Sequence, residues 1–317
     1  MRKTIALLLI LIVISCFIFA EGNTEQMDQD ESLTTLFAEL IEQQQYKQDH
    51  YYELAQPTQV LETLYTALGP DVVSYVEYEV PETQMQVIKI WYPSELAENT
   101  YPAVIFVNGT GVTASQYTAV FRHLASWGFI AVGTEDPSTG SGESTNQTLL
   151  YLLGLNDNPD SPLFGKVDTS AIGLCGHSQG GAGVFSALTI NAPSIYKTAV
   201  SLSPTHEETA WLLGWQYRLD LIQIPILMVA GTAGEFETQS VIPIEKMIAM
   251  YDKIPSSKAM MRRIGAEHGE MLYSADAYVT AWMLWQLKCD SRAAEVFIVS
   301  NPELLANETY QDQRIDI

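Results

Sequence analysis

A serine lies in the glycine-rich segment Gly176-His177-Ser178-Gln179-Gly180, directly after an apolar run that is typical of a β-strand. The pattern G-x-S-x-G is typical of a nucleophilic serine on a sharp turn between a strand and a helix. Small residues must flank such a turn, and the N-terminus of the following helix favours developing negative charge. The alternative is a glycine-rich turn with a helix-capping serine. The apolar strand before the segment and the helical pattern after it favour the nucleophile.

A serine nucleophile needs a base that takes its proton, and the chain has five histidines. His268 follows the last predicted strand and comes last in chain order, as the base does in serine hydrolases built on parallel sheets. His206, which follows an earlier strand, is the second candidate. His50 precedes the sheet, His123 falls inside a predicted helix, and His177 belongs to the turn itself, so none of these three is favoured.

A carboxylate should orient the histidine, and it is expected after the strand predicted at 224–231. That segment offers Glu235 and Glu237 and no aspartate. We favour Glu235 because it lies nearer the strand end, and Glu237 remains open. Glu207 or Glu208, after the preceding strand, is the further alternative.

Attack on a carbonyl also needs N–H donors for the negative oxygen that forms. One donor is the backbone N–H of Gln179, next to the serine. The other is expected in the loop after the strand at 102–107, where Thr110 is best placed and Gly111 comes next. The glycines at 109 and 111 leave backbone open to a substrate.

Other chemistries fit the sequence poorly. The segment 267–270 (EHGE) lacks the second histidine of a helical zinc site, and no cysteine cluster exists. The glycine-rich segments lack the G-K-[ST] ending of a phosphate-binding loop. We therefore expect neither a metal nor a cofactor.

Strand and helix patterns alternate from about residue 72 onward. The segments 72–80 and 85–93 alternate like an antiparallel hairpin. Later strands are expected at 102–107, 129–135, 168–176, 196–203, 224–231 and 258–265, with helices between them. This order predicts one α/β domain with a mostly parallel central sheet, helices on both faces and no large lid. The tail after about residue 297 is expected to wrap over the surface.

The N-terminal residues are expected to direct export. Two cations precede an apolar run, which predicts a signal peptide over 1–20 with cleavage after Ala20. The alternative is a lipoprotein motif, VISC, that ends at Cys16 and would leave a lipid anchor on that cysteine, and a retained anchor is a third possibility. Residues 21–70 are predicted to form an acidic linker and short helices at 33–44 and 58–68, and 71–317 to form the main domain.

The formal net charge is −22, which repels phosphate backbones, so nucleic acid is not an expected partner. Cys175 closes an apolar strand and Cys289 follows a tryptophan-rich helix. Both are expected to be core residues, and an exported location permits a disulfide between them.

With these residues placed, the chain resembles the α/β-hydrolase fold. It is similar to the group around dienelactone hydrolases, chlorophyllases and cutinase-type polyester hydrolases. The segments that carry the resemblance lie between about 102 and 287: PAVIFVNGTG, HLASWGFIAVGTED, VDTSAIGLCGHSQGGAG, IPILMVAGTA, GAEHGEML and YVTAWMLWQL.

The resemblance implies an esterase, and with the predicted signal peptide we expect an exported enzyme that acts on small-molecule or lipid-like esters without a cofactor. It implies Ser178 as nucleophile, His268 as base, and the N–H groups of Thr110 and Gln179 as oxyanion donors. This sequence departs from those relatives where Gly234 and Glu235 stand near their aspartate. It also has His177 where several polyester hydrolases have tryptophan.

Three aromatic residues, Tyr117, Trp127 and Trp211, are candidates to line the cleft, and we expect core packing for each. Two rival functions remain. An acyltransferase or amidase would use the same triad, and a hydrolase-fold binding protein would have lost its activity.

Overall fold

The computed structural model describes residues 55–97, 99–190 and 193–317. The predicted signal peptide, Cys16 and the helix predicted at 33–44 lie outside the described residues. Within these ranges no helix is long and apolar enough to cross a bilayer.

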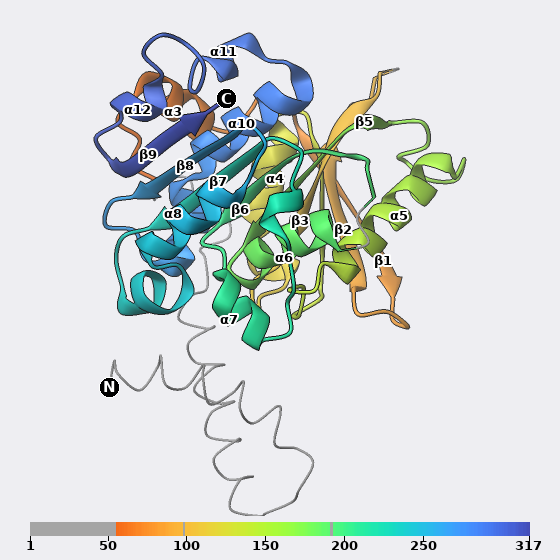
Figure 1. The fold of residues 1–317 in the computed structure, drawn as a ribbon. Coiled ribbons are helices and arrows are strands. Elements are labelled where there is room, and N and C mark those ends of the chain that lie inside the picture. The colour runs from red at the N-terminus through yellow and green to blue at the C-terminus, as the bar shows by residue number, and fades with distance from the viewer. Residues whose placement is uncertain (1–54, 98, 191–192) are drawn as a thin grey trace, which may run out of the picture.

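The described residues form one nine-stranded sheet in the order β1-β2-β4-β3-β5-β6-β7-β8-β9 (Figure 1). Strands β3 to β8 run parallel, and β1 and β2 form the antiparallel hairpin that the sequence predicts. The α/β prediction with a mostly parallel sheet is confirmed. The strands are β1 Val73–Val80, β2 Gln86–Pro93, β3 Tyr101–Val107, β4 Ile130–Thr134, β5 Val167–His177, β6 Tyr196–Leu202, β7 Ile226–Gly231, β8 Lys258–Arg263 and β9 Tyr310–Asp316.

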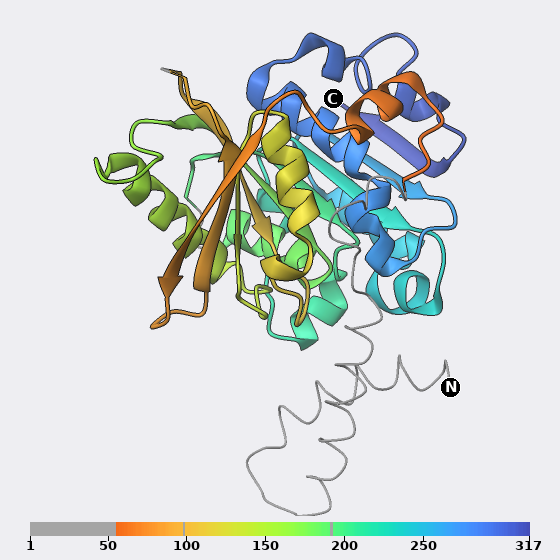
Figure 2. The same ribbon diagram turned by 180° about the vertical axis from the view of Figure 1, so that it is seen from behind.

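Helices cover both faces of the sheet because the central strands bury side chains on both sides. In β3, Val104 and Phe106 belong to one hydrophobic cluster, and Ile105 and Val107 to the other. Helices α3, α4 and α10 pack on the first face (Figure 2), and α5, α6 and α8 on the second (Figure 1). The helices are α3 Val60–Thr66, α4 Thr118–Ser126, α5 Glu143–Asp157, α6 Gln179–Thr189, α7 Glu207–Leu212, α8 Ile244–Lys253, α9 Met271–Ser274, α10 Asp276–Lys288, α11 Ser291–Ala294 and α12 Glu303–Ala306.

The C-terminal tail differs from the expected surface wrap. After α12 the chain forms β9, which pairs antiparallel with β8 and is the last strand at that edge of the sheet. Its sequence, YQDQRID, is mostly polar because one of its edges and one of its faces meet solvent. A strand of this composition lacks the apolar pattern by which strands are recognised, so the sequence did not indicate it.

The two cysteines also differ from each other. Cys175 is buried, as expected, whereas Cys289 is exposed, and both are free thiols. Cys289 ends α10 in a left-handed backbone conformation, with φ of 55°. That turn directs it out of the core, so its predicted core position is wrong.

A buried ion pair joins the layer of helices on the first face. The His123 Nδ1 of α4 lies 2.6 Å from the Asp276 carboxylate of α10, and both side chains are buried. The His123 Nε2 lies 2.9 Å from the carbonyl oxygen of Ala67. Since both ring nitrogens face acceptors, the ring carries a proton on each. Burial opposes this charge, but Asp276 and the backbone acceptors raise the pKa of His123 above its usual value.

We expect His123→Ala to lower the free energy of unfolding by about 3–5 kcal/mol, because it removes the cation beside a buried carboxylate. A raised histidine pKa contributes stability fully below the unfolded value of 6.5 and loses it as pH rises through the folded pKa. Urea unfolding of both proteins at about pH 6 and about pH 9 measures this. The difference between them should shrink at the higher pH. A difference independent of pH would mean that the histidine contributes by packing alone.

Candidate active site

Ser178 lies on the sharp turn between β5 and α6, at the carboxyl edge of the sheet. It has φ of 61° and ψ of −120°, a conformation that costs energy for a residue with a side chain. The flanking glycines are required sterically. A Cβ on Gly180 would lie 1.9 Å from the carbonyl oxygen of Val107, and one on Gly176 would lie 2.3 Å from that of Gly180. Ser178 itself is only half-buried, so its hydroxyl group is open to a substrate.

A buried histidine–carboxylate pair stands at the same edge. His268 follows β8 in a 3₁₀ turn, and its Nδ1 lies 2.6 Å from Oε2 of Glu237. The other carboxylate oxygen, Oε1, accepts hydrogen bonds from Ser203 Oγ and from the backbone N–H of Gly231, each at 2.6 Å. Burial alone would raise the pKa of Glu237, but these hydrogen bonds, that of His268 foremost, hold it below its usual value. Glu237 therefore remains a carboxylate inside the protein.

The preference for Glu235 over Glu237 is not supported by this geometry. Glu235 is exposed, whereas Glu237 has no exposed surface and carries the contact with His268. The cause is the backbone after β7. Gly234 takes a positive φ of 75°, and the segment Phe236–Val241 then winds as a π-helical turn. This path turns Glu237 inward beneath the end of the sheet.

The other acid and base candidates, on or beside α7, have other side-chain partners. Glu207 pairs with Lys253 at 2.6 Å, and Glu208 pairs with Lys246. The Nε2 atom of His206 lies 3.1 Å from Thr209 Oγ1. These side chains therefore form contacts within α7 and between α7 and α8.

The loop after β3 lies against the serine. A Cβ built on Gly109 would stand 3.7 Å from Ser178 Cβ, which is ordinary van der Waals contact. The N–H of Gly111 donates to Pro137 O at 2.9 Å, which commits it elsewhere and leaves Thr110 as the residue of this loop suited to donate. The N–H of Gln179 occupies the first position of α6, where a helix provides no acceptor of its own. Gln179 directly follows Ser178, and Thr110 directly follows Gly109, the residue of this loop that lies against the serine.

A family model described as PET hydrolase-like matches residues 48–315. The chain belongs to the PET hydrolase-like family. The resemblance to cutinase-type polyester hydrolases and to the α/β-hydrolase fold is thereby confirmed.

Among similar proteins, cutinase est2 of Thermobifida alba is 28% identical over 186 residues, which is 56% of this chain and 56% of that protein. A cutinase of Thermobifida fusca (strain YX) is 26% identical over 187 residues, with the same coverage of both chains. A bis(hydroxyethyl) terephthalate hydrolase of Streptomyces coelicolor (strain ATCC BAA-471 / A3(2) / M145) is 29% identical over 127 residues, 38% of this chain and 39% of that protein. The chain thus matches about half the length of these cutinases.

In this PET hydrolase-like chain, two further residues support the His268–Glu237 pair, and the sequence analysis did not identify either as a site residue. His177 is buried, and its Nε2 lies 2.8 Å from the backbone carbonyl oxygen of His268, with the two rings 4.6 Å apart. Burial, followed by the nearby His268, lowers the pKa of His177 to about 3, so the ring is neutral and its Nε2–H donates to that carbonyl. The position of His177 in the turn was the available signal.

Ser203 is the second such residue. It is buried just after β6, with φ of 42°, and donates to Glu237. Its place at the carboxyl end of a strand was the only sequence signal, and a serine there is too common to be singled out.

Proposed function

We propose that this chain is an exported serine hydrolase that cleaves carboxylic esters through an acyl-enzyme. The observation that carries the proposal is the half-exposed Ser178 on its strained turn, at the sheet edge where Glu237 holds His268. The family membership and the names of the cutinase relatives support ester hydrolysis. Export rests on the predicted signal peptide over 1–20, which lies outside the described residues.

In the proposed reaction, Ser178 Oγ attacks the ester carbonyl carbon while His268 Nε2 takes the hydroxyl proton. Glu237 accepts the hydrogen bond from Nδ1 and stabilises the imidazolium that forms. The N–H groups of Thr110 and Gln179 donate to the negative oxygen. The imidazolium then returns its proton to the departing alcohol, which leaves an acyl-serine. Water attacks this ester in turn, with His268 again as the base, and releases the acid and the free serine.

For the substrate, we propose uncharged apolar esters of the cutin or polyester type. The relatives named cutinase and bis(hydroxyethyl) terephthalate hydrolase support this class. The strongly acidic chain, with its net charge of −22, agrees with it because it would repel anionic substrates.

The direct test is turnover of p-nitrophenyl esters of increasing acyl length, together with labelling of the protein by a fluorophosphonate. Hydrolysis to the free acid and labelling of Ser178 are expected. Acyl transfer to an added alcohol or amine in preference to water would identify an acyltransferase. Tight ester binding with neither turnover nor labelling would identify an inactive binding protein.

Ser203 is expected to act as a positioning residue for Glu237, and Ser203→Gly tests this because glycine accepts the positive φ. Loss of a hydrogen bond to a charged group, about 1.5–3 kcal/mol, should lower kcat roughly tenfold or more. It should also raise the pKa of Glu237, which the hydroxyl group helps to lower. A carboxyl with a lowered folded pKa contributes stability above its unfolded value of 4.5 and loses it as pH falls through the folded pKa. The acid limbs of activity and stability should therefore both move to higher pH.

The matched control is Ser201→Ala, which removes a buried hydroxyl group of β6 that donates to Gly181 O. This variant should keep the wild-type pH profile even if it is less stable. The same pH shift in both variants would show that Ser203 contributes only to packing.

A further inference from the structure

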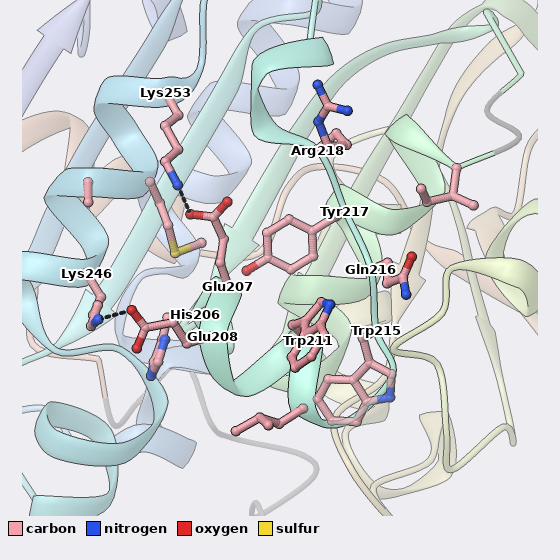
Figure 3. Close-up of a pocket in the computed structure, with 14 residues that line it drawn as sticks. His206, Glu207, Glu208, Trp211, Trp215, Gln216, Tyr217, Arg218, Lys246 and Lys253 are labelled. Atoms are coloured by element: carbon pink, nitrogen blue, oxygen red, sulfur yellow. Dashed lines mark hydrogen bonds and ion pairs between the residues drawn. The ribbon is translucent and has the colours of Figure 1, made fainter.

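A groove of about 800 Å³ lies between α7, α8 and the segment 215–218 (Figure 3). Trp211, Trp215 and Tyr217 stand on one side of it, and Lys246 and Lys253 of α8 on the other. The groove is preformed. The Tyr217 hydroxyl donates to the carbonyl oxygen of Thr205 at 2.9 Å, and the Tyr217 ring packs on Phe185, with ring centres 5.2 Å apart.

Apolar surface is exposed at this groove, contrary to the core packing expected for Trp211. Trp211 is 67% exposed and the adjacent Leu212 is 58% exposed, and both line the groove. Tyr117, in contrast, is buried as predicted, and Trp127 packs against the core. A tryptophan held in solvent beside a preformed hollow is typical of a surface that contacts an apolar ligand.

The charges around the groove cancel in pairs. Lys253 pairs with Glu207 at 2.6 Å, Lys246 with Glu208, and Arg218 with Asp220 at 2.6 Å. Burial lowers the pKa of His206, which also lines the groove, so its ring is neutral at neutral pH. In a chain with a net charge of −22, such a neutral hollow matches an uncharged ligand.

One polar group at the groove lacks a protein partner. His206 Nδ1 is buried and makes no hydrogen bond with any part of the chain that the structure describes. Because this nitrogen has almost no exposed surface, a ligand in the groove contacts the aromatic and paired side chains of its walls and not this atom.

The groove adjoins the candidate active site through His206. Thr205, the preceding residue, donates its N–H to the carbonyl oxygen of Ser178 at 3.3 Å. The N–H of His206 donates at 3.0 Å to the carbonyl oxygen of Val241, the last residue of the turn that carries Glu237.

The groove adjoins the same site on its other wall. A Cβ on Gly140 would lie 2.4 Å from the Trp215 indole, so this ring covers the backbone of the loop after β4. The neighbouring residue Thr139 donates its N–H to the side chain of Gln179 at 2.9 Å. The groove is therefore bordered by the segments that hold both Ser178 and a proposed oxyanion donor.

We propose that this groove binds a second, remote unit of an extended uncharged ester chain whose scissile bond lies at Ser178. The unit is an aromatic ring or a long alkyl segment, which contacts Trp211 and Trp215. The inference rests on the proposed function, and it names the part of the surface that distinguishes an oligomeric ester from a short one.

The test compares Trp211→Ala with Phe164→Ala. Phe164 is a matched control because it is an exposed aromatic residue, at 51%, outside the groove lining. The readout is the ratio of kcat/KM for p-nitrophenyl palmitate to that for p-nitrophenyl acetate. We expect this ratio to fall roughly tenfold in Trp211→Ala and to be unchanged in Phe164→Ala. An unchanged ratio in Trp211→Ala, or an equal fall in both variants, would overturn the proposal.

A second arm separates failure of the groove from failure of the proposed function. Ser178→Ala protein, with and without Trp211→Ala, is titrated onto polycaprolactone nanoparticles, and bound protein is measured without any turnover. We expect adsorption to weaken roughly fivefold or more when Trp211 is absent. Equal adsorption by both proteins contradicts the groove. Wild-type protein that hydrolyses no ester but still adsorbs through Trp211 contradicts the hydrolase and leaves the binding surface standing.

Discussion

Replacement of Ser178 by alanine will lower kcat for p-nitrophenyl esters by roughly 10⁴–10⁶-fold and leave only the residual rate that substrate binding and the proposed oxyanion donors support. The variant loses the hydroxyl group that attacks the ester carbonyl in the proposed reaction. His268 and the proposed oxyanion donors remain, but His268 then has no hydroxyl group to activate.

The measurement is initial rates for the two proteins on the same ester, with fluorophosphonate labelling in parallel. Ser186→Ala is a suitable control, since Ser186 is a buried serine of α6 whose hydroxyl group donates to Gly140 O. It should retain both turnover and labelling. Turnover that survives in Ser178→Ala would mean that another group attacks the ester.

Replacement of Glu237 by glutamine will lower kcat by roughly 10³–10⁴-fold, although the side chain keeps its shape. Two donors, Ser203 Oγ and Gly231 N–H, point at Oε1, and His268 Nδ1 points at Oε2. A glutamine satisfies the two donors with its carbonyl oxygen, which turns its NH₂ group toward His268. Nδ1 must then accept, so the proton moves to Nε2. A histidine in that tautomer cannot take the proton of Ser178.

Glu235→Gln is the matched control, two residues away in the same segment. Because Glu235 is exposed, this variant should keep a kcat within about twofold of wild type. Thermal unfolding of both variants verifies that each is folded. A large loss in Glu235→Gln, with Glu237→Gln active, would assign the acid to Glu235 and reverse the proposed triad.

Much of the fold and site could be read from local patterns. The alternation of apolar strands and helices predicts a parallel sheet because strands buried on both faces need helices to cover them. The G-x-S-x-G pattern predicts the sharp turn that carries Ser178 because only small residues permit that backbone path, as the close contacts around Gly176 and Gly180 illustrate. His268 follows by elimination among five histidines and by its place after a strand.

Features that depend on distant contacts were decided by the tertiary structure alone. Glu235 and Glu237 lie two residues apart in one segment, and the sequence favoured Glu235, but the π-helical turn after Gly234 buries Glu237 and leaves Glu235 exposed. Ser203 and His177 became part of the site only when β5, β6 and β8 met at one edge.

The same division holds at the edge of the sheet and at the groove. The polar strand β9 is stabilised by its pairing with β8. No local sequence pattern predicts this pairing. Trp211 has a large apolar side chain that is expected in the core, yet α7 exposes it to solvent beside α8. The sequence by itself determined most of the elements and the turn that carries the proposed nucleophile, since short-range sterics and periodicity encode them. Packing alone decided which side chains contact one another, because the local sequence around a residue does not show which distant residue it will contact.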